Sequence, residues 1–173
     1  LPPAVPANAQ PSGGARLLSQ QSVCPARAFL EQRLGAKEIR IPQFGIDPRT
    51  RGKLVHWVLD AFFGLVSSHT ALVDLAPVQV NSILDKLLQR GVRECFGRRR
   101  GTMAELVQLE AMRLKPILIN FLAVEARRED FTVVQTEIDQ EVKLGGLVLR
   151  LRLDRIDCLA NGSLLVIDYK TGR

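Results

Sequence analysis

The chain has 173 residues, 46% of them hydrophobic and 24% charged, which is enough for one folded domain with a buried core. Its formal charge of +6 and pI near 9.7 favour a polyanionic partner. No apolar run is long enough to span a membrane and the three cysteines follow no disulfide pattern, which excludes membrane-spanning and disulfide-stapled proteins and favours a reducing cytoplasm.

The first residues show no hydrophobic periodicity. Residues 1–16 are rich in Pro, Ala, Gly and Ser, and we interpret them as a linker or disordered lead-in to one domain over residues 17–173. Because the first residue is Leu1 rather than Met, we expect a piece cut from a longer protein.

Helical patterns occupy most of the chain before residue 130. The first helix is expected to start at Ser19 or Ser22 and to run to about Leu34, where Gly35 ends it. Pro116 is expected to kink or divide the last helix, because proline removes one backbone hydrogen bond. The other helices are predicted over residues 49–63, 77–97 and 102–128.

The helix over residues 49–63 carries a histidine at the border of its apolar stripe. The spacing of that stripe lets His56 look toward the core. A lone histidine in such a position is usually a satisfied core residue, and a ligand role is the alternative. His69 lies at a Ser/Thr-rich helix end without comparable context.

A short window after the helix over residues 77–97 is rich in arginine. Guanidinium groups suit contacts with phosphate, and a solvated basic loop is an equal alternative. The arginines in or next to this window are Arg90, Arg93, Arg98, Arg99 and Arg100.

From residue 131 the periodicity changes to that of strands. One strand is predicted over residues 131–142 and a second over residues 147–153, with two glycines in the turn between them. In the second strand Arg150 and Arg152 alternate with leucines and share a face with Asp154, as expected for a face that meets a phosphate backbone. The pattern slips after Asp154, which predicts a bulge there.

A third strand ends in charged residues. Leu164–Ile167 are all aliphatic, which predicts a strand buried on both faces. The chain then runs into Asp168, Tyr169 and Lys170. The carboxylate and the ammonium project from the same face, about 6–7 Å apart along the strand. Such charges at the end of a buried strand are costly unless a ligand or a reaction uses them.

The loop between the last two strands decides which side chains face each other. A two-residue turn at Asn161-Gly162 would set Asp154 opposite Tyr169. A three-residue loop over 160–162, with its glycine in the left-handed conformation, sets Asp154 opposite Asp168. We favour the second register, in which two carboxylates converge and require a cation such as Mg²⁺ or Mn²⁺. A plain surface hairpin with solvated charges is the alternative.

Two motifs resemble a known family. Asp154-Arg155-Ile156-Asp157 with Val166-Ile167-Asp168-Tyr169-Lys170-Thr171-Gly172 resembles the nuclease motif of the RecB/AddB branch of PD-(D/E)XK enzymes. The stretch over residues 51–59 is similar to the first RecB-type motif, "RGxxxHxxL". The resemblance covers about residues 19–173. It implies an α/β (α+β) fold with a restriction-endonuclease-like core, in which N-terminal helices flank a C-terminal three-stranded antiparallel sheet.

The resemblance also implies roles for the matching residues. Asp154, Asp168 and Lys170 would be catalytic. His56, the two aspartates and the backbone carbonyl of Tyr169 would bind Mg²⁺ or Mn²⁺, which would polarise the scissile phosphate and activate a water. The lysine would orient or deprotonate that water, or neutralise charge on the phosphorus.

Two further residues have weaker support. Glu137 resembles a glutamate on the first core strand of the family and is expected as an accessory group, with a solvent-facing side chain as the alternative. Cys24 lies in a stretch similar to the "CPxRxFL" helix of AddB-like nucleases, where such a cysteine is an iron–sulfur ligand. Cys95 and Cys158 do not match the other ligand positions, so we favour a small buried thiol and expect a [4Fe-4S] cluster only in the full-length parent.

The function that these motifs imply is that of a metal-dependent DNA nuclease domain, an exonuclease acting in recombinational double-strand-break repair in the bacterial cytoplasm. Its expected partners are DNA and a helicase–nuclease subunit or a helicase-like region of the parent chain. Family members continue into a closing helix and strand, and we expect this fragment to lack both and to be impaired. The alternative is a non-catalytic DNA-binding or scaffold module of an AddB-like repair protein.

Overall fold

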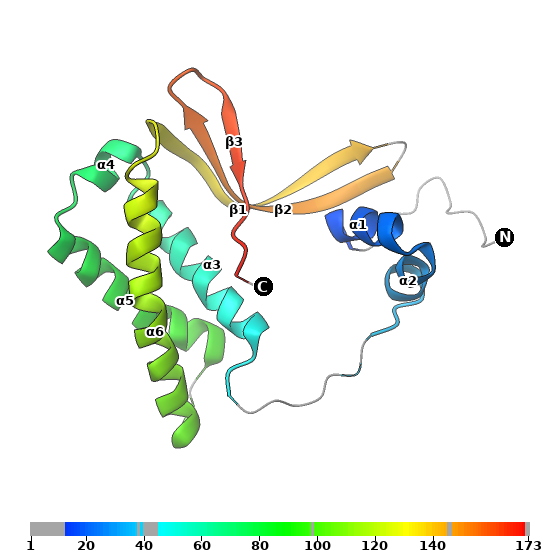
Figure 1. The fold of residues 1–173 in the computed structure, drawn as a ribbon, viewed down its shortest axis with the longest axis horizontal. Coiled ribbons are helices and arrows are strands. Elements are labelled where there is room, and N and C mark those ends of the chain that lie inside the picture. Colours follow the sequence, from blue (N-terminus) through cyan, green and yellow to red (C-terminus); the bar gives the residue numbers. More distant parts are fainter. Residues whose placement is uncertain (1–12, 38, 40–44, 98, 145–146, 172–173) are drawn as a thin grey trace. The chain divides into compact units, whose positions relative to one another are not determined.

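A computed structural model describes residues 13–37, 39, 45–97, 99–144 and 147–171. Within these ranges the helices come first and an antiparallel sheet follows, as predicted (Figure 1). The chain forms two compact units, one comprising Leu1–Ile41 with Ile138–Leu153 and the other Pro42–Glu137 with Asp154–Arg173. Whether residues 17–173 act as one domain stays a prediction.

The first unit contains short helices where one longer helix was predicted. Cys24 separates them with an extended backbone (φ −154°, ψ 98°), because the residue before a proline is disfavoured in the helical conformation. The helix therefore begins earlier than predicted, and Ser22 lies near its end rather than at its cap. The elements are α1 (Ala15–Val23), α2 (Pro25–Ala28) and the π-helical turn η1 (Phe29–Arg33).

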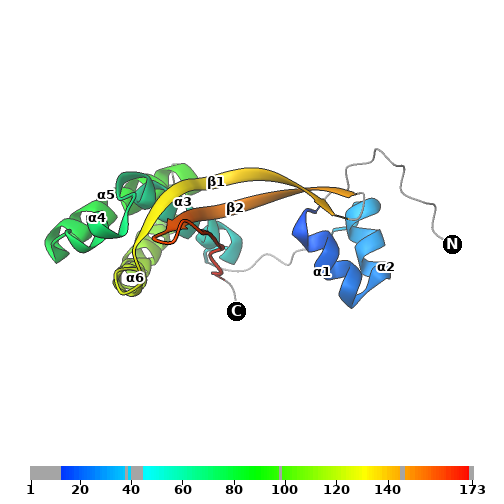
Figure 2. The same ribbon diagram turned by 90° about the horizontal axis from the view of Figure 1, so that it is seen from above.

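The second unit is built on packed helices with a common apolar core. Phe62, Leu84 and Leu118 are almost completely buried where three of these helices meet. Figure 2 shows the helices gathered beside α6, which is viewed nearly end-on. The elements are α3 (Pro48–Leu65), α4 (His69–Val73), α5 (Pro77–Phe96) and α6 (Thr102–Glu125).

Pro116 lies inside α6 and does not divide it, so of the two expected effects the division is excluded and the kink stays a prediction. Proline removes the hydrogen bond to the carbonyl group four residues earlier, which belongs to Met112. Both residues lie on the exposed side of the helix, where water can hydrogen-bond to this carbonyl group.

The strands β1 (Phe131–Leu144), β2 (Leu147–Leu159) and β3 (Leu164–Ile167) form one sheet in the order β1-β2-β3. β2 and β3 pair antiparallel with Arg155 opposite Ile167 and Cys158 opposite Leu164. The loop between them has three residues and ends in Gly162, whose φ is 79°. The predicted loop is therefore confirmed, and the next position in the register sets Asp154 against Asp168.

Two strand predictions are wrong. Between Arg155 and Cys158 the pairs follow one another without an extra residue, so the bulge predicted after Asp154 is absent from this pairing. The burial of β3 on both faces also fails, since Leu164, Leu165 and Val166 are 66%, 38% and 52% exposed. The reason is that only Ile167 of β3 packs against the helical core, so the other side chains of the strand are not covered by it.

Candidate metal centre

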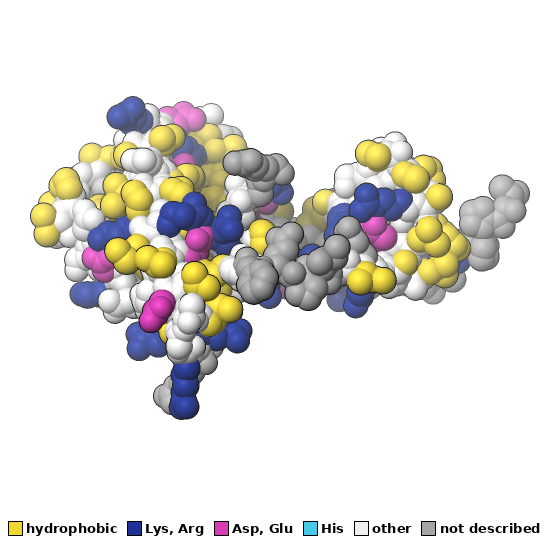
Figure 3. Space-filling view, turned by 60° about the horizontal axis from the view of Figure 1, so that its bottom comes forward, with side chains coloured by type: hydrophobic (Ala, Val, Ile, Leu, Met, Phe, Trp, Pro, Cys, Tyr) yellow, Lys and Arg dark blue, Asp and Glu magenta, His cyan; other side chains and the backbone are white. Residues whose placement is uncertain are grey.

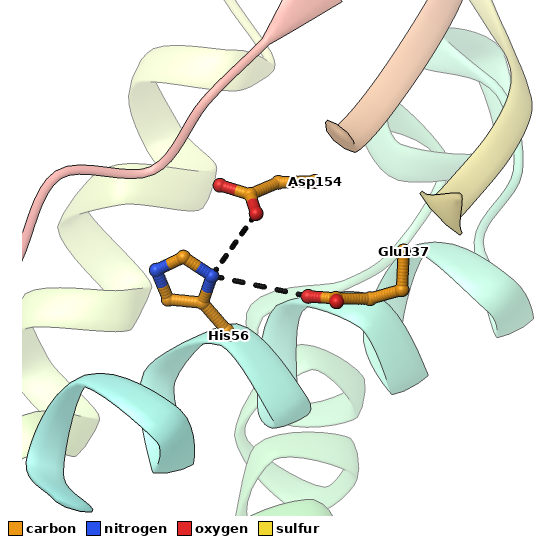
Figure 4. A group of neighbouring side chains, drawn as sticks. All are labelled: His56, Glu137 and Asp154. Atoms are coloured by element: carbon orange, nitrogen blue, oxygen red, sulfur yellow. Dashed lines mark ion pairs between the residues drawn. The ribbon is translucent and has the colours of Figure 1, made fainter. Parts of the chain in front are cut away.

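Three side chains that can bind a metal meet in the second unit. Each of His56, Glu137 and Asp154 offers one ligand atom, and these atoms lie within 4.8 Å of one another. His56 Nδ1 is 3.2 Å from Asp154 Oδ1 and 3.8 Å from Glu137 Oε1 (Figure 4). An imidazole nitrogen and two carboxylate oxygens form a donor set that fits a divalent cation, and such a cation offsets the repulsion between the carboxylates.

His56 owes its position to the amphipathic character of α3. Val58, Leu59 and Phe62 face the helical core, and His56 stays partly exposed. Its ring packs edge-on against Tyr169, with ring centroids 5.8 Å apart. The structure thus brings the histidine from the helix to the strand residue Asp154, almost a hundred positions later in the chain.

Asp154 is buried, and each of its oxygens has a separate partner. The backbone N–H of Tyr169 donates to Asp154 Oδ2 at 2.6 Å, while Oδ1 faces His56. A hydrogen bond from a backbone amide stabilises the charged carboxylate and fixes its direction. Tyr169 therefore has a structural role at the centre through its N–H, and the metal-binding role of its carbonyl group stays a prediction.

Glu137 lies closer to the centre than sequence reasoning suggested. Its backbone has φ 48°, a conformation that non-glycine residues rarely adopt and that occurs preferentially at functional sites. The sequence contains a weak signal for it, because the apolar positions of β1 change from odd (Phe131, Val133) to even (Ile138). This change of phase indicates an irregularity on β1 near Glu137.

Asp168 and Lys170 lie at the exposed border of the centre. They form an ion pair with each other, and their side chains are 55% and 81% exposed. The hydrogen bond and charge of the Lys170 ammonium group hold the pKa of Asp168 below its ordinary value. The same ion pair raises the pKa of Lys170. Asp168 is thus near Asp154 but outside the group of three converging ligand atoms.

Gly52 brings the segment after Lys170 close to α3. A Cβ atom at Gly52 would lie only 2.9 Å from Thr171 Oγ1, so a larger residue would displace that side chain. Gly52 and His56 are one helical turn apart and lie on the same side of α3. Gly52 therefore accommodates Thr171 after β3, and His56 meets the carboxylate of Asp154 on β2.

The predicted DNA-binding arginines are divided between the two units. Arg99 and Arg100 are exposed, and Arg98 lies outside the described residues. Arg150, in the first unit, pairs with Glu141 at 3.1 Å, and Arg152 is exposed. Figure 3 shows Lys and Arg side chains (dark blue) separated by hydrophobic ones (yellow) on the face in view. Contact of these arginines with DNA stays a prediction.

Cys24 is exposed, so its interpretation as a buried thiol is wrong. It lies in the break between α1 and α2, where the chain is extended and no core forms around it. In the described part of the chain no cysteine belongs to a group of metal-binding side chains. Its role as an iron–sulfur ligand stays a prediction.

Comparison with known protein families gives a match that covers most of the chain. The sequence model of the PD-(D/E)XK nuclease superfamily matches residues 17–173. This range contains His56, Glu137 and Asp154 as well as Asp168 and Lys170. No helix in the described ranges has the length and apolar character that crossing a membrane requires.

Proposed function

This chain belongs to the PD-(D/E)XK nuclease superfamily, and from that premise we propose that it hydrolyses phosphodiester bonds of DNA at the centre formed by His56, Glu137 and Asp154. The observation that carries the proposal is the convergence of these ligand atoms from α3, β1 and β2 to within 4.8 Å. Two carboxylates this close repel each other unless a cation lies between them.

Each residue of the centre has a separate role in the proposed reaction. His56, Glu137 and Asp154 would hold Mg²⁺ or Mn²⁺, with Asp168 at the border as a further ligand. The bound cation would polarise the scissile phosphate and lower the pKa of a water. The Tyr169 N–H keeps Asp154 in place. Lys170, whose ammonium group is exposed and paired with Asp168, would contact the phosphate and neutralise the charge that develops on it.

We further propose that the parent protein is an AddB-like exonuclease of recombinational double-strand-break repair in the bacterial cytoplasm, working with a helicase subunit or region. The support is the similarity of residues 154–157 and 166–172 to the RecB/AddB motif. The exposure of Cys24 is compatible with a [4Fe-4S] cluster completed by cysteines elsewhere in the parent.

The test is cleavage of linear DNA with Mg²⁺ or Mn²⁺ by the wild-type chain and by Asp154→Asn. We expect Asp154→Asn to lower the rate on the order of a hundredfold, because it removes a charged ligand. Glu141→Gln is the matched control, since this carboxylate is exposed, pairs with Arg150 and lies in the first unit. Equal rates for wild type and Asp154→Asn would refute the nuclease, and DNA binding without cleavage would favour the scaffold alternative.

A further inference from the structure

A completely buried arginine directly follows Asp154. Arg155 is 0% exposed, as is Asp157, and Glu125 is 5% exposed. Arginine is almost never fully buried unless it is paired. This cluster lies beside the metal centre, and the roles proposed above for the centre do not use it.

The guanidinium group of Arg155 has partners on every side. It donates to both oxygens of Asp157 at 2.6 Å, and its Nη2 is 2.8 Å from Glu125 Oε2. Its face stacks on Phe63 at 3.7 Å, and Phe131 lies at 4.8 Å. Bidentate pairing and stacking together fix both the position and the plane of the group.

A second arginine balances the charge of the cluster. Arg128 Nη1 contacts Glu125 at 2.7 Å and Asp157 at 3.2 Å, so two cations face two carboxylates. Arg128 is more exposed than Arg155, and the described residues offer its buried Nη2 no hydrogen-bond partner. The two arginines thus share their carboxylates but differ in their other contacts.

Stability alone does not explain this cluster. The desolvation of buried ions offsets most of their attraction, and apolar residues of similar volume often stabilise a fold as well or better. The unsatisfied Arg128 Nη2 adds a further cost. The contribution of the cluster is therefore to be found in the geometry that it imposes.

That geometry reaches the metal centre by two routes. Arg155 is the chain neighbour of Asp154, and successive residues of a strand point to opposite faces, so fixing one directs the other. Arg155 Nη1 also lies 3.5 Å from the hydroxyl group of Tyr169. The Tyr169 ring contacts His56, and its N–H binds Asp154.

We propose that Arg155 is a positioning residue for the metal centre, holding Asp154 and Tyr169 so that Asp154 faces His56. The proposal rests on the proposed function, because it assigns this geometry to a site that binds a divalent cation. Arg155 touches neither the cation nor the DNA.

Two charge-matched double variants test the proposal in the full chain. Arg155→Met with Glu125→Gln leaves Arg128 paired with Asp157, whereas Arg128→Met with Glu125→Gln leaves Arg155 paired with Asp157. Both remove the same charges from the same cluster. Arg155→Lys is the third variant, since it keeps the charge but loses the bidentate geometry.

The first measurement is the NMR signals of the histidine rings without metal, which is simple because the chain has only two histidines. We expect the His56 signals to shift in both Arg155 variants and to stay at their wild-type positions in the Arg128 variant. His69 contacts Phe131, whose ring centroid lies 4.8 Å from the guanidinium carbon of each arginine. The His69 signals should therefore shift equally in the two double variants.

The second measurement is titration with Mn²⁺ alone. We expect both Arg155 variants to bind Mn²⁺ at least about tenfold more weakly than the Arg128 variant, as for loss of a group that orients a ligand. Unchanged His56 signals in a folded Arg155 variant, or full Mn²⁺ affinity in Arg155→Lys, would overturn the positioning role. If the Arg155→Met double variant fails to fold, Arg155→Lys decides the question.

The outcomes also separate this proposal from the proposed function. A wild-type chain that neither binds Mn²⁺ nor cleaves DNA refutes the nuclease, while the His56 signals still report whether Arg155 positions Asp154 and Tyr169. If the wild type is active and the His56 signals are the same in wild type and in the Arg155 variants, only the positioning role is refuted.

Discussion

Glu137 offers a test of the link between backbone strain and the metal centre. Its φ of 48° lies in the left-handed region, which costs a non-glycine residue about 1–2 kcal/mol. Glycine adopts this region freely but loses about 0.5–1 kcal/mol more backbone entropy on folding than alanine. Glu137→Gly should therefore be more stable than Glu137→Ala by about 0.5–1 kcal/mol.

The comparison with alanine isolates the backbone term. Both variants lose the carboxylate, and with it the repulsion from Asp154. The difference between their free energies of unfolding therefore comes mainly from the backbone conformation at residue 137. Urea denaturation measures it as a shift of the midpoint at constant slope. Both variants should bind Mn²⁺ more weakly than wild type, by about tenfold or more, if Glu137 is a ligand.

Two results would refute this reasoning. If Glu137→Gly is no more stable than Glu137→Ala, the left-handed backbone carries no strain. If both variants bind Mn²⁺ as tightly as wild type, Glu137 lies near the centre without serving it. If Glu137→Gly is more stable than wild type and binds Mn²⁺ less tightly, the native Glu137 lowers the stability of the fold while it serves the site.

Three other changes test the surroundings of the centre. Gly52→Val should lower the rate of DNA cleavage about tenfold or more by displacing Thr171, while the helix content measured by circular dichroism stays unchanged. The double variant Gly52→Ala with Thr171→Ala should retain activity, because it relieves the contact at 2.9 Å. Phe62→Ala should lower the free energy of unfolding in urea by about 3–5 kcal/mol, since this ring is fully buried, and a loss below 1 kcal/mol would contradict the packing. The hydrogen bond from Arg113 lowers the pKa of Glu110. The ionised Glu110 therefore stabilises the fold fully above the ordinary pKa of 4.5, and this stabilisation is lost as the pH falls through the lowered pKa. Glu110→Gln should therefore be less stable than wild type at neutral pH and equal to it in acid, and a constant difference across the titration would exclude this carboxylate as the cause.

Several features follow from local rules and were predicted from the sequence. The hairpin register is one, because the period of two and the length of the loop over 160–162 together decide which residues of β2 and β3 pair. The helix with His56 at the border of its apolar stripe is another, because a period of 3.6 residues assigns its faces. The break at Cys24, by contrast, was not predicted, although it follows from a local rule, the effect of proline on the preceding residue.

Other features depend on which segments meet in space, and no local pattern contains that information. The aliphatic residues of β3 predicted burial, but a strand is buried only if other elements cover it, and only Ile167 of β3 packs against the helical core. Arg155 is charged, as most surface residues are, and is nevertheless enclosed by Glu125 and two phenylalanines from distant segments. Glu137 joins His56 and Asp154 because α3, β1 and β2 converge there. The sequence by itself determined the register of the hairpin and named His56 and Asp154 as candidate ligands, since both follow from neighbouring residues. The tertiary structure alone decided which three side chains share one centre and which arginine is buried beside it, because long-range packing sets those distances.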